Sequence, residues 1–88
     1  MVSYIITYDL CDNSKDYDKL YECIKSNYCW AKLTESSWFI KTNSTSSQIR
    51  DRIGKVIDSK DRLFVAKLTG EAAWNNVICS NQYLHQNL

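Results

Sequence analysis

The hydrophobic and polar positions along this chain follow two periods, and each period predicts a kind of element. Residues 4–9 are β-branched and aromatic, which is typical of a strand. Apolar residues then return every three or four positions, which predicts a helix of about 13 residues that begins near Lys15 with Ser14 as its cap. The apolar face of this helix consists of Tyr17, Leu20, Tyr21, Ile24 and Tyr28.

The middle of the chain predicts a hairpin followed by a second helix. Residues 29–34 and 36–42 carry Trp, Leu, Phe and Ile at strand-like spacing, with a tight connection at 34–35. The polar segment 43–47 contains residues that cap helices well. The apolar stripe of the second helix is Ile49, Ile53, Val56 and Ile57.

A turn at 58–61 leads to a fourth predicted strand at 62–68. The order strand–helix–strand–strand–helix–strand is the split βαβ pattern. We therefore predict an α+β, ferredoxin-like βαββαβ domain, with four antiparallel strands and both helices on one face of the sheet. Residues 1–88 form a single domain in this interpretation, with its core at 3–69.

Both faces of the predicted sheet are apolar. In the fourth strand, for example, Leu63 and Val65 point to one face and Phe64 to the other. Two helices cover only one face, and a large exposed apolar face is unusual on a monomer. We therefore expect a homodimer that buries the second face, since two-fold dimers are the commonest oligomers. The alternative is that the C-terminal segment 70–88, which contains Trp74, folds over this face.

The C-terminal segment 70–88 is harder to interpret. Residues 72–78 are apolar enough for a short helix or an extra edge strand, whereas 82–88 reads as a loose polar tail. We expect this segment to pack on the core or on a dimer partner.

Composition narrows the class of protein. The chain has 88 residues, no proline and two glycines, which favours compact regular structure over disorder. Its net charge of +1 is small for a protein held to nucleic acid mainly by electrostatics. Contact with DNA or RNA would therefore need a local basic patch or a metal ion.

Targeting signals and cysteines point to a cytoplasmic protein without a membrane partner. No apolar run reaches the ~20 residues of a membrane span, and no basic segment precedes the first apolar run. The four cysteines lack the spacing of a zinc site or a CxxC motif, so we expect reduced thiols. Cys11, close to Asp9, is the candidate for reactivity.

Four short motifs occur in order along the chain. They are Tyr8-Asp9-Leu10, the helix with Leu20 and Ile24, Glu35-Ser36-Ser37-Trp38, and Asp61-Arg62-Leu63-Phe64-Val65. Together they resemble the Cas-two proteins, which are small dimeric CRISPR-adaptation proteins related in fold to the virulence-associated D ribonucleases. The resemblance covers roughly residues 3–69 and suggests a divergent member.

The resemblance implies a face-to-face homodimer in which two copies of Asp9 lie across the axis and hold Mg²⁺ or Mn²⁺. It implies metal-dependent nuclease activity in some members and a structural role in others. Ser36 and Ser37 match the region of a family serine, and either could hydrogen-bond a phosphate or a metal-bound water. Lys32 and Arg62 are further candidates for contact with nucleic acid.

Simpler interpretations of the same residues stay open. An aspartate at the end of a strand is often a turn former, and the sequence places no second carboxylate strongly beside Asp9, although Asp12 is near. Trp30, Trp38 and Trp74 are typical core or interface anchors.

Two functions follow. One is a nucleic-acid-associated dimer with weak metal-dependent endonuclease activity at Asp9. The other is a non-enzymatic interaction or inhibitor protein, such as a phage or mobile-element factor directed against host defence.

Overall fold

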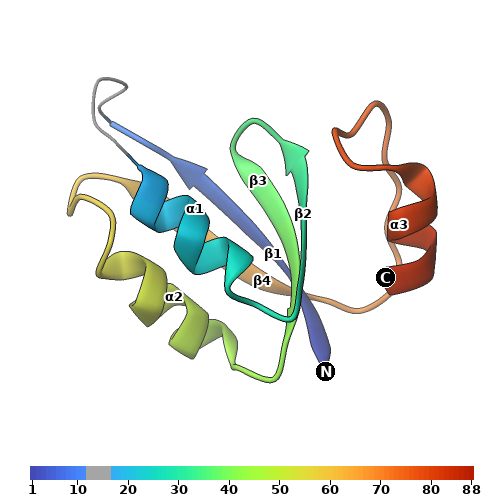
Figure 1. The fold of residues 1–88 in the computed structure, drawn as a ribbon, viewed down its shortest axis with the longest axis horizontal. Coiled ribbons are helices and arrows are strands. Elements are labelled where there is room, and N and C mark those ends of the chain that lie inside the picture. Colours follow the sequence, from blue (N-terminus) through green and yellow to red (C-terminus); the bar gives the residue numbers. More distant parts are fainter. Residues whose placement is uncertain (12–16) are drawn as a thin grey trace.

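The computed structural model describes residues 1–11 and 17–88, and its centre is a four-stranded antiparallel sheet in the order β2-β3-β1-β4. The strands are β1 Val2–Asp9, β2 Cys29–Thr34, β3 Ser37–Thr42 and β4 Arg62–Leu68. The helices are α1 Asp18–Lys25, α2 Ser46–Gly54 and α3 Asn81–Asn87. Helices α1 and α2 lie side by side on one face of the sheet (Figure 1). The predicted ferredoxin-like fold is therefore confirmed.

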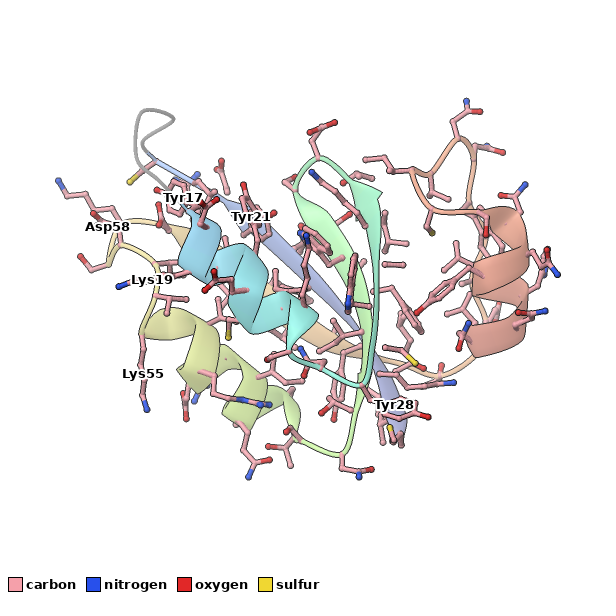
Figure 2. All side chains as sticks on the ribbon, in the orientation of Figure 1. Tyr17, Lys19, Tyr21, Tyr28, Lys55 and Asp58 are labelled. Carbon is pink, nitrogen blue, oxygen red and sulfur yellow. The ribbon has the colours of Figure 1, made fainter. Side chains whose placement is uncertain are left out.

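The first helix is shorter than its apolar pattern predicts. Its last turn is closed by local hydrogen bonds, in which Ser26 Oγ donates to the carbonyl of Cys23 (2.6 Å) and Asn27 Nδ2 donates to that of Ile24 (2.7 Å). Tyr28, expected on the apolar face of the helix, lies beyond its end and is 75% exposed (Figure 2). That assignment was wrong because these polar residues end the helix first. The predicted start near Lys15, with Ser14 as cap, falls outside the described residues.

The second helix begins with a complete capping box. Thr45 Oγ1 accepts a hydrogen bond from the backbone N–H of Gln48 (3.2 Å), and the Gln48 side chain accepts one from the N–H of Thr45 (2.9 Å). The helix ends at Gly54, earlier than predicted. Val56 and Ile57 are therefore not helical, but they still pack against the core.

The main core lies between the sheet and helices α1 and α2. Its fully enclosed side chains include Ile6, Leu20, Ile24, Ile40, Ile49 and Ile53. The indole N–H of Trp38 donates to Tyr8 Oη across 2.9 Å, so two aromatic residues are buried here without an unpaired polar group. Burial raises the pKa of Tyr8 despite this hydrogen bond, which keeps its phenol neutral.

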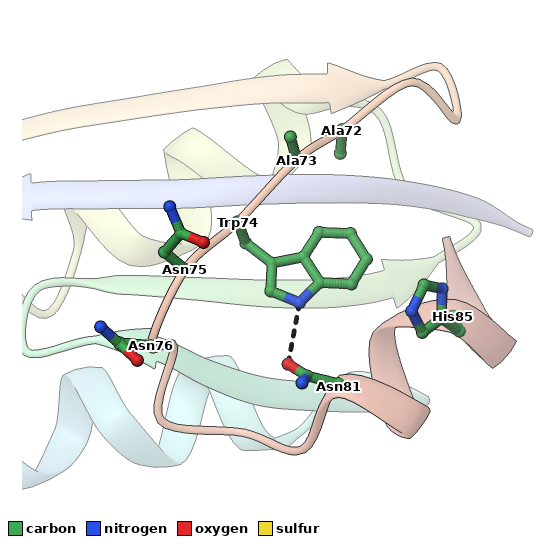
Figure 3. A pocket seen from close by; sticks show the side chains of 7 residues that line it. All are labelled: Ala72, Ala73, Trp74, Asn75, Asn76, Asn81 and His85. Carbon is green, nitrogen blue, oxygen red and sulfur yellow. Dashed lines mark hydrogen bonds between the residues drawn. The ribbon is translucent and has the colours of Figure 1, made fainter.

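The C-terminal segment covers much of the other face. It crosses in front of the sheet, with α1 and α2 behind (Figure 3). A second core cluster forms here around Ala31, Phe39 and Leu84. The backbone N–H groups of Ile78 and Cys79 donate to the carbonyls of Leu33 (2.9 Å) and Lys32 (3.0 Å), which attaches the segment to β2.

Two expectations change as a result. Residues 82–88 are not a loose tail, because Ser80 caps α3 (Tyr83 N to Ser80 Oγ, 3.1 Å) and Leu84 is only 3% exposed. A helix this short is stable only because it packs against the sheet. Over β2 and β3 the structure also shows the alternative to a dimer, a face covered by the chain's own C-terminal segment. Among the described residues, no helix is long and apolar enough to cross a membrane.

If α3 belongs to the core, Leu84→Ala will lower the free energy of unfolding by about 2–5 kcal/mol, because it leaves a cavity between α3 and Phe39. Urea unfolding followed by circular dichroism measures this. Gln86→Ala, at an exposed position on the same helix, is the control and should change stability by less than about 0.5 kcal/mol. Equal small effects of both variants would contradict the docking of α3.

Candidate functional site at the end of the sheet

Asp9 is the last residue of β1 and lies opposite Arg62, the first residue of β4. Arg62 Nη1 and Asp9 Oδ2 are 2.9 Å apart, and both side chains are largely exposed, by 84% and 69%. The strand register thus brings together two residues that are 53 positions apart in the chain. An exposed pair of this kind contributes less than about 1 kcal/mol, so a ligand can displace either partner at small cost.

Asp61 holds the chain that follows Asp9. Its carboxylate accepts hydrogen bonds from the backbone N–H groups of Cys11 (2.8 Å) and Asp58 (2.8 Å) and from Tyr17 Oη (3.2 Å). Desolvation works to raise the pKa of Asp61, but these hydrogen bonds outweigh it and hold the pKa below its usual value. The end of β1, the start of α1 and the turn before β4 are therefore joined at one carboxylate.

The same carboxylate bears on the expected reactivity of Cys11. A hydrogen bond from the Cys11 thiol to Asp61 raises the thiol pKa, and desolvation adds to the effect. Cys11 is exposed, but it stays a thiol near neutral pH and is a weak nucleophile. Burial also raises the pKa of Cys23 and of Cys79. All four cysteines, which lie in the described part of the chain, are free.

A pocket of about 290 Å³ opens beside Asp9. Its lining includes Tyr21 from α1 and Glu35 and Ser36 from the turn between β2 and β3. The backbone N–H of Tyr8 donates to the carbonyl of Ser36 (3.0 Å), which fixes this turn against β1. The pocket lining thus includes the carboxylates of Asp9 and Glu35 and the hydroxyl of Ser36, all of them hard oxygen donors.

Glu35 is the residue that sequence reasoning missed as a partner of Asp9. The signal was available, because in a βαββαβ sheet the β2–β3 turn lies at the same end as the end of β1. Glu35 also belongs to one of the four motifs. It makes a 3.7 Å ion pair with Lys32, and its own side chain is 92% exposed.

Of the five residues predicted for the site, the structure brings four to this end of the sheet. Asp9 pairs with Arg62, Ser36 lines the same pocket as Asp9, and Lys32 pairs with Glu35. Ser37 does not belong with them. It is buried, it shares a 2.6 Å hydrogen bond with Thr34 Oγ1, and it lines an apolar pocket beneath the C-terminal segment. Ser36 lies in the turn, whereas Ser37 begins β3 with its side chain buried, which separates the two serines.

Aromatic rings continue from the pocket along the helix-covered face of β2. Tyr21 lies 6.1 Å from Trp38, and Trp38 lies 5.9 Å from Trp30, measured between ring centroids. Lys25 Nζ is 5.0 Å from the centroid of Trp30, and Lys32 Nζ is 5.6 Å from that of Trp38. Trp30 is 42% exposed, so it is not a fully buried anchor. We refer to Lys25, Trp30 and Lys32 as the Trp30 strip.

The donor set fits a divalent cation only in part. Within residues 1–11 and 17–88 there is no cluster of three or more histidine, cysteine or acidic side chains. Mg²⁺, however, is commonly held by one or two carboxylates, with water and substrate phosphate completing its shell. Asp9 and Glu35 are the two carboxylates that line this pocket among the described residues, whereas Asp12 lies outside them. No protein-family model matches the chain.

The role of Asp61 predicts a pH dependence. Because its pKa is lower in the folded than in the unfolded chain, its stabilising contribution is complete above the unfolded pKa, about 3.8, and is lost as the pH falls through the folded pKa. Asp61→Asn should therefore lower the melting temperature at pH 7 and flatten its decline on acidification below about pH 5. Thermal unfolding followed by circular dichroism at several pH values measures both effects.

The control for this measurement is Asp51→Asn. Asp51 is an exposed carboxylate on α2 that pairs with Arg50 across 3.0 Å and accepts no hydrogen bond from the β1 end of the sheet. It should leave both the melting temperature and its pH profile almost unchanged. An Asp61→Asn profile parallel to that of the wild type would rule out Asp61 as the source of the acid dependence.

Proposed function

We propose that this protein binds single-stranded nucleic acid along the surface that runs from the Asp9 pocket to the Trp30 strip. One observation carries the proposal: the ammonium group of Lys25 lies over the ring of Trp30, which is 42% exposed on the edge strand β2, and Lys32 lies beside it over the buried ring of Trp38. Exposed aromatic rings stack on bases and nearby cations neutralise phosphates. The strip provides the local basic patch that a chain of net charge +1 requires.

The finer proposal is weak, metal-dependent cleavage of DNA or RNA at the Asp9 end. Asp9 and Glu35 would hold Mg²⁺ or Mn²⁺, and the exposed hydroxyl of Ser36 would hydrogen-bond a phosphate. A bound divalent cation would polarise the phosphodiester and activate a water. Arg62, released from Asp9 when the cation binds, would neutralise the phosphate. These roles agree with what the resemblance to Cas-two proteins implies for Asp9.

We also propose a homodimer, whose interface is smaller than the whole sheet face that the sequence predicts. The C-terminal segment covers the sheet over β2 and β3, whereas Phe64 on the outer strand β4 is still 63% exposed. Light scattering at micromolar concentration should give twice the chain mass of 10.3 kDa, and Phe64→Ser should reduce it. A wild-type mass equal to that of one chain would refute the dimer.

Cleavage is tested with labelled single-stranded DNA and RNA in the presence of Mg²⁺, Mn²⁺ or a chelator. Wild-type protein should cleave only with metal, and Asp9→Ala should be at least about tenfold slower, since it loses a charged ligand. Asp51→Ala removes a carboxylate that is also paired with an arginine and similarly exposed, and it should retain full activity. Cleavage that is absent throughout, or equal in Asp9→Ala, would reject the nuclease while leaving binding open to the next experiment.

Binding is tested by fluorescence anisotropy with the same oligonucleotides and no metal. Trp30→Ala should weaken binding by about 5- to 150-fold, because base–aromatic stacking contributes ~1–3 kcal/mol. Lys25→Ala should reduce the salt dependence of the binding constant by about one phosphate contact. Lys55→Ala, just after α2, is the matched control and should bind like the wild type (Figure 2).

The binding experiment distinguishes the two alternative functions. If no oligonucleotide binds, the non-enzymatic interaction protein becomes the better interpretation. Its supporting observation is that the Asp9–Arg62 and Lys32–Glu35 ion pairs balance the charge at this end of the sheet, as at a surface that meets another protein.

A further inference from the structure

A larger pocket lies in the C-terminal segment, on the opposite side of the sheet from α1 and α2 (Figure 3). It is an open hollow on the surface with a volume of about 490 Å³. Two alanines line it together with Trp74, three asparagines and His85. No residue of this pocket contributes to the Asp9 pocket or to the Trp30 strip.

Trp74 is the fixed element of the pocket. It lines this polar pocket and also the apolar pocket that contains Phe39 and Leu84, so it separates the two. Its indole N–H donates to Asn81 Oδ1 across 3.0 Å, drawn as a dashed line in Figure 3. The His85 ring is tilted against it by 56°, with 5.1 Å between centroids. The ring is therefore held in place without a ligand, which lowers the entropic cost of stacking on it.

The rim of the pocket is built from neutral polar groups. Asn75, Asn76 and Asn81 are exposed, and each carboxamide offers both donors and acceptors. Asn76 adopts a φ of 55°, a left-handed conformation that asparagine tolerates better than most residues and that shapes the loop. Among the described residues that line the pocket, none is lysine or arginine. This chemistry suits an uncharged planar ring with donors and acceptors along its edge.

We propose that the Trp74 pocket binds a nucleobase, supplied by a free nucleoside or by an unpaired nucleotide of a longer strand. The base stacks on the indole of Trp74, and the carboxamides of Asn75 and Asn76 hydrogen-bond its edge. Asparagine pairs with both a donor and an acceptor of adenine, so adenine is the base that the amide rim fits best. The His85 ring lies beside the stacked base, on the side opposite the loop that carries Asn75 and Asn76.

This site goes beyond the function proposed for the Asp9 end, because it needs neither a metal ion nor a phosphate contact. A probe without phosphate therefore tests it independently. We choose adenosine for the full-length chain, with glucose as the competing class of neutral ligand, since sugars also stack on tryptophan and bond to amides.

The experiment is a titration followed by ¹H–¹⁵N correlation spectra. Adenosine should produce saturable shifts of the Trp74 indole N–H and of the Asn75 and Asn76 carboxamides, while the Trp30 indole signal stays in place. Asn75→Ala and His85→Ala should weaken binding at least about fivefold, the scale of one lost hydrogen bond or ring contact. Gln82→Ala, exposed on α3 but outside the pocket, should bind adenosine like the wild type.

Several outcomes would overturn the assignment. They are the absence of saturable shifts, shifts centred on Trp30, a response to glucose as strong as that to adenosine, and Asn75→Ala and His85→Ala variants that bind normally. Asp9→Ala and Trp30→Ala should retain adenosine binding even though they impair the activities proposed for the other face. Failure of one proposal is therefore distinguishable from failure of the other.

Discussion

The structure depends on covering both faces of one apolar sheet. Residues of β1 and β3 point large side chains to each side: Ile6 and Ile40 lie under α1 and α2, and Phe39 lies under the C-terminal segment. A domain of this size has a thin core, so neither face can be left open cheaply. The short helix α3 and the irregular chain before it exist as ordered structure because Leu84 and Trp74 close the second face.

The antiparallel order of the strands also explains where the candidate site residues lie. The end of β1, the β2–β3 turn and the start of β4 all lie at one end of the sheet. Asp9, Glu35, Ser36 and Arg62 therefore lie at the same end, although they come from three separate segments of the chain. The carboxylate of Asp61 then fixes the chain that leaves β1 through hydrogen bonds from Cys11 and Tyr17, and it accepts a third from Asp58 in its own turn. The charged groups at this end form two ion pairs, Asp9 with Arg62 and Lys32 with Glu35. A ligand can replace a partner in an exposed pair of this kind at small cost.

The two faces carry different chemistry as a consequence. On the helix side, Lys25 and Lys32 lie over aromatic rings, which suits a polyanion. On the C-terminal side, the Trp74 pocket has neutral amides and an imidazole, which suit an uncharged ring. A nucleic-acid strand that used both proposed surfaces would have its phosphates bound on one side of the sheet and a base bound on the other.

Local patterns in the sequence determined most of the fold. The four strands, of which 29–34 and 62–68 have the predicted bounds, and the cap of the second helix follow from alternation and capping, which are properties of neighbouring residues. The candidate role of Asp9 came from the resemblance to the Cas-two proteins and stays a prediction. Only the tertiary structure decided that 81–87 is a helix and that Glu35 lines the same pocket as Asp9. These depend on contacts between residues far apart in the chain, which no local period encodes, and the covered second face is the largest of them.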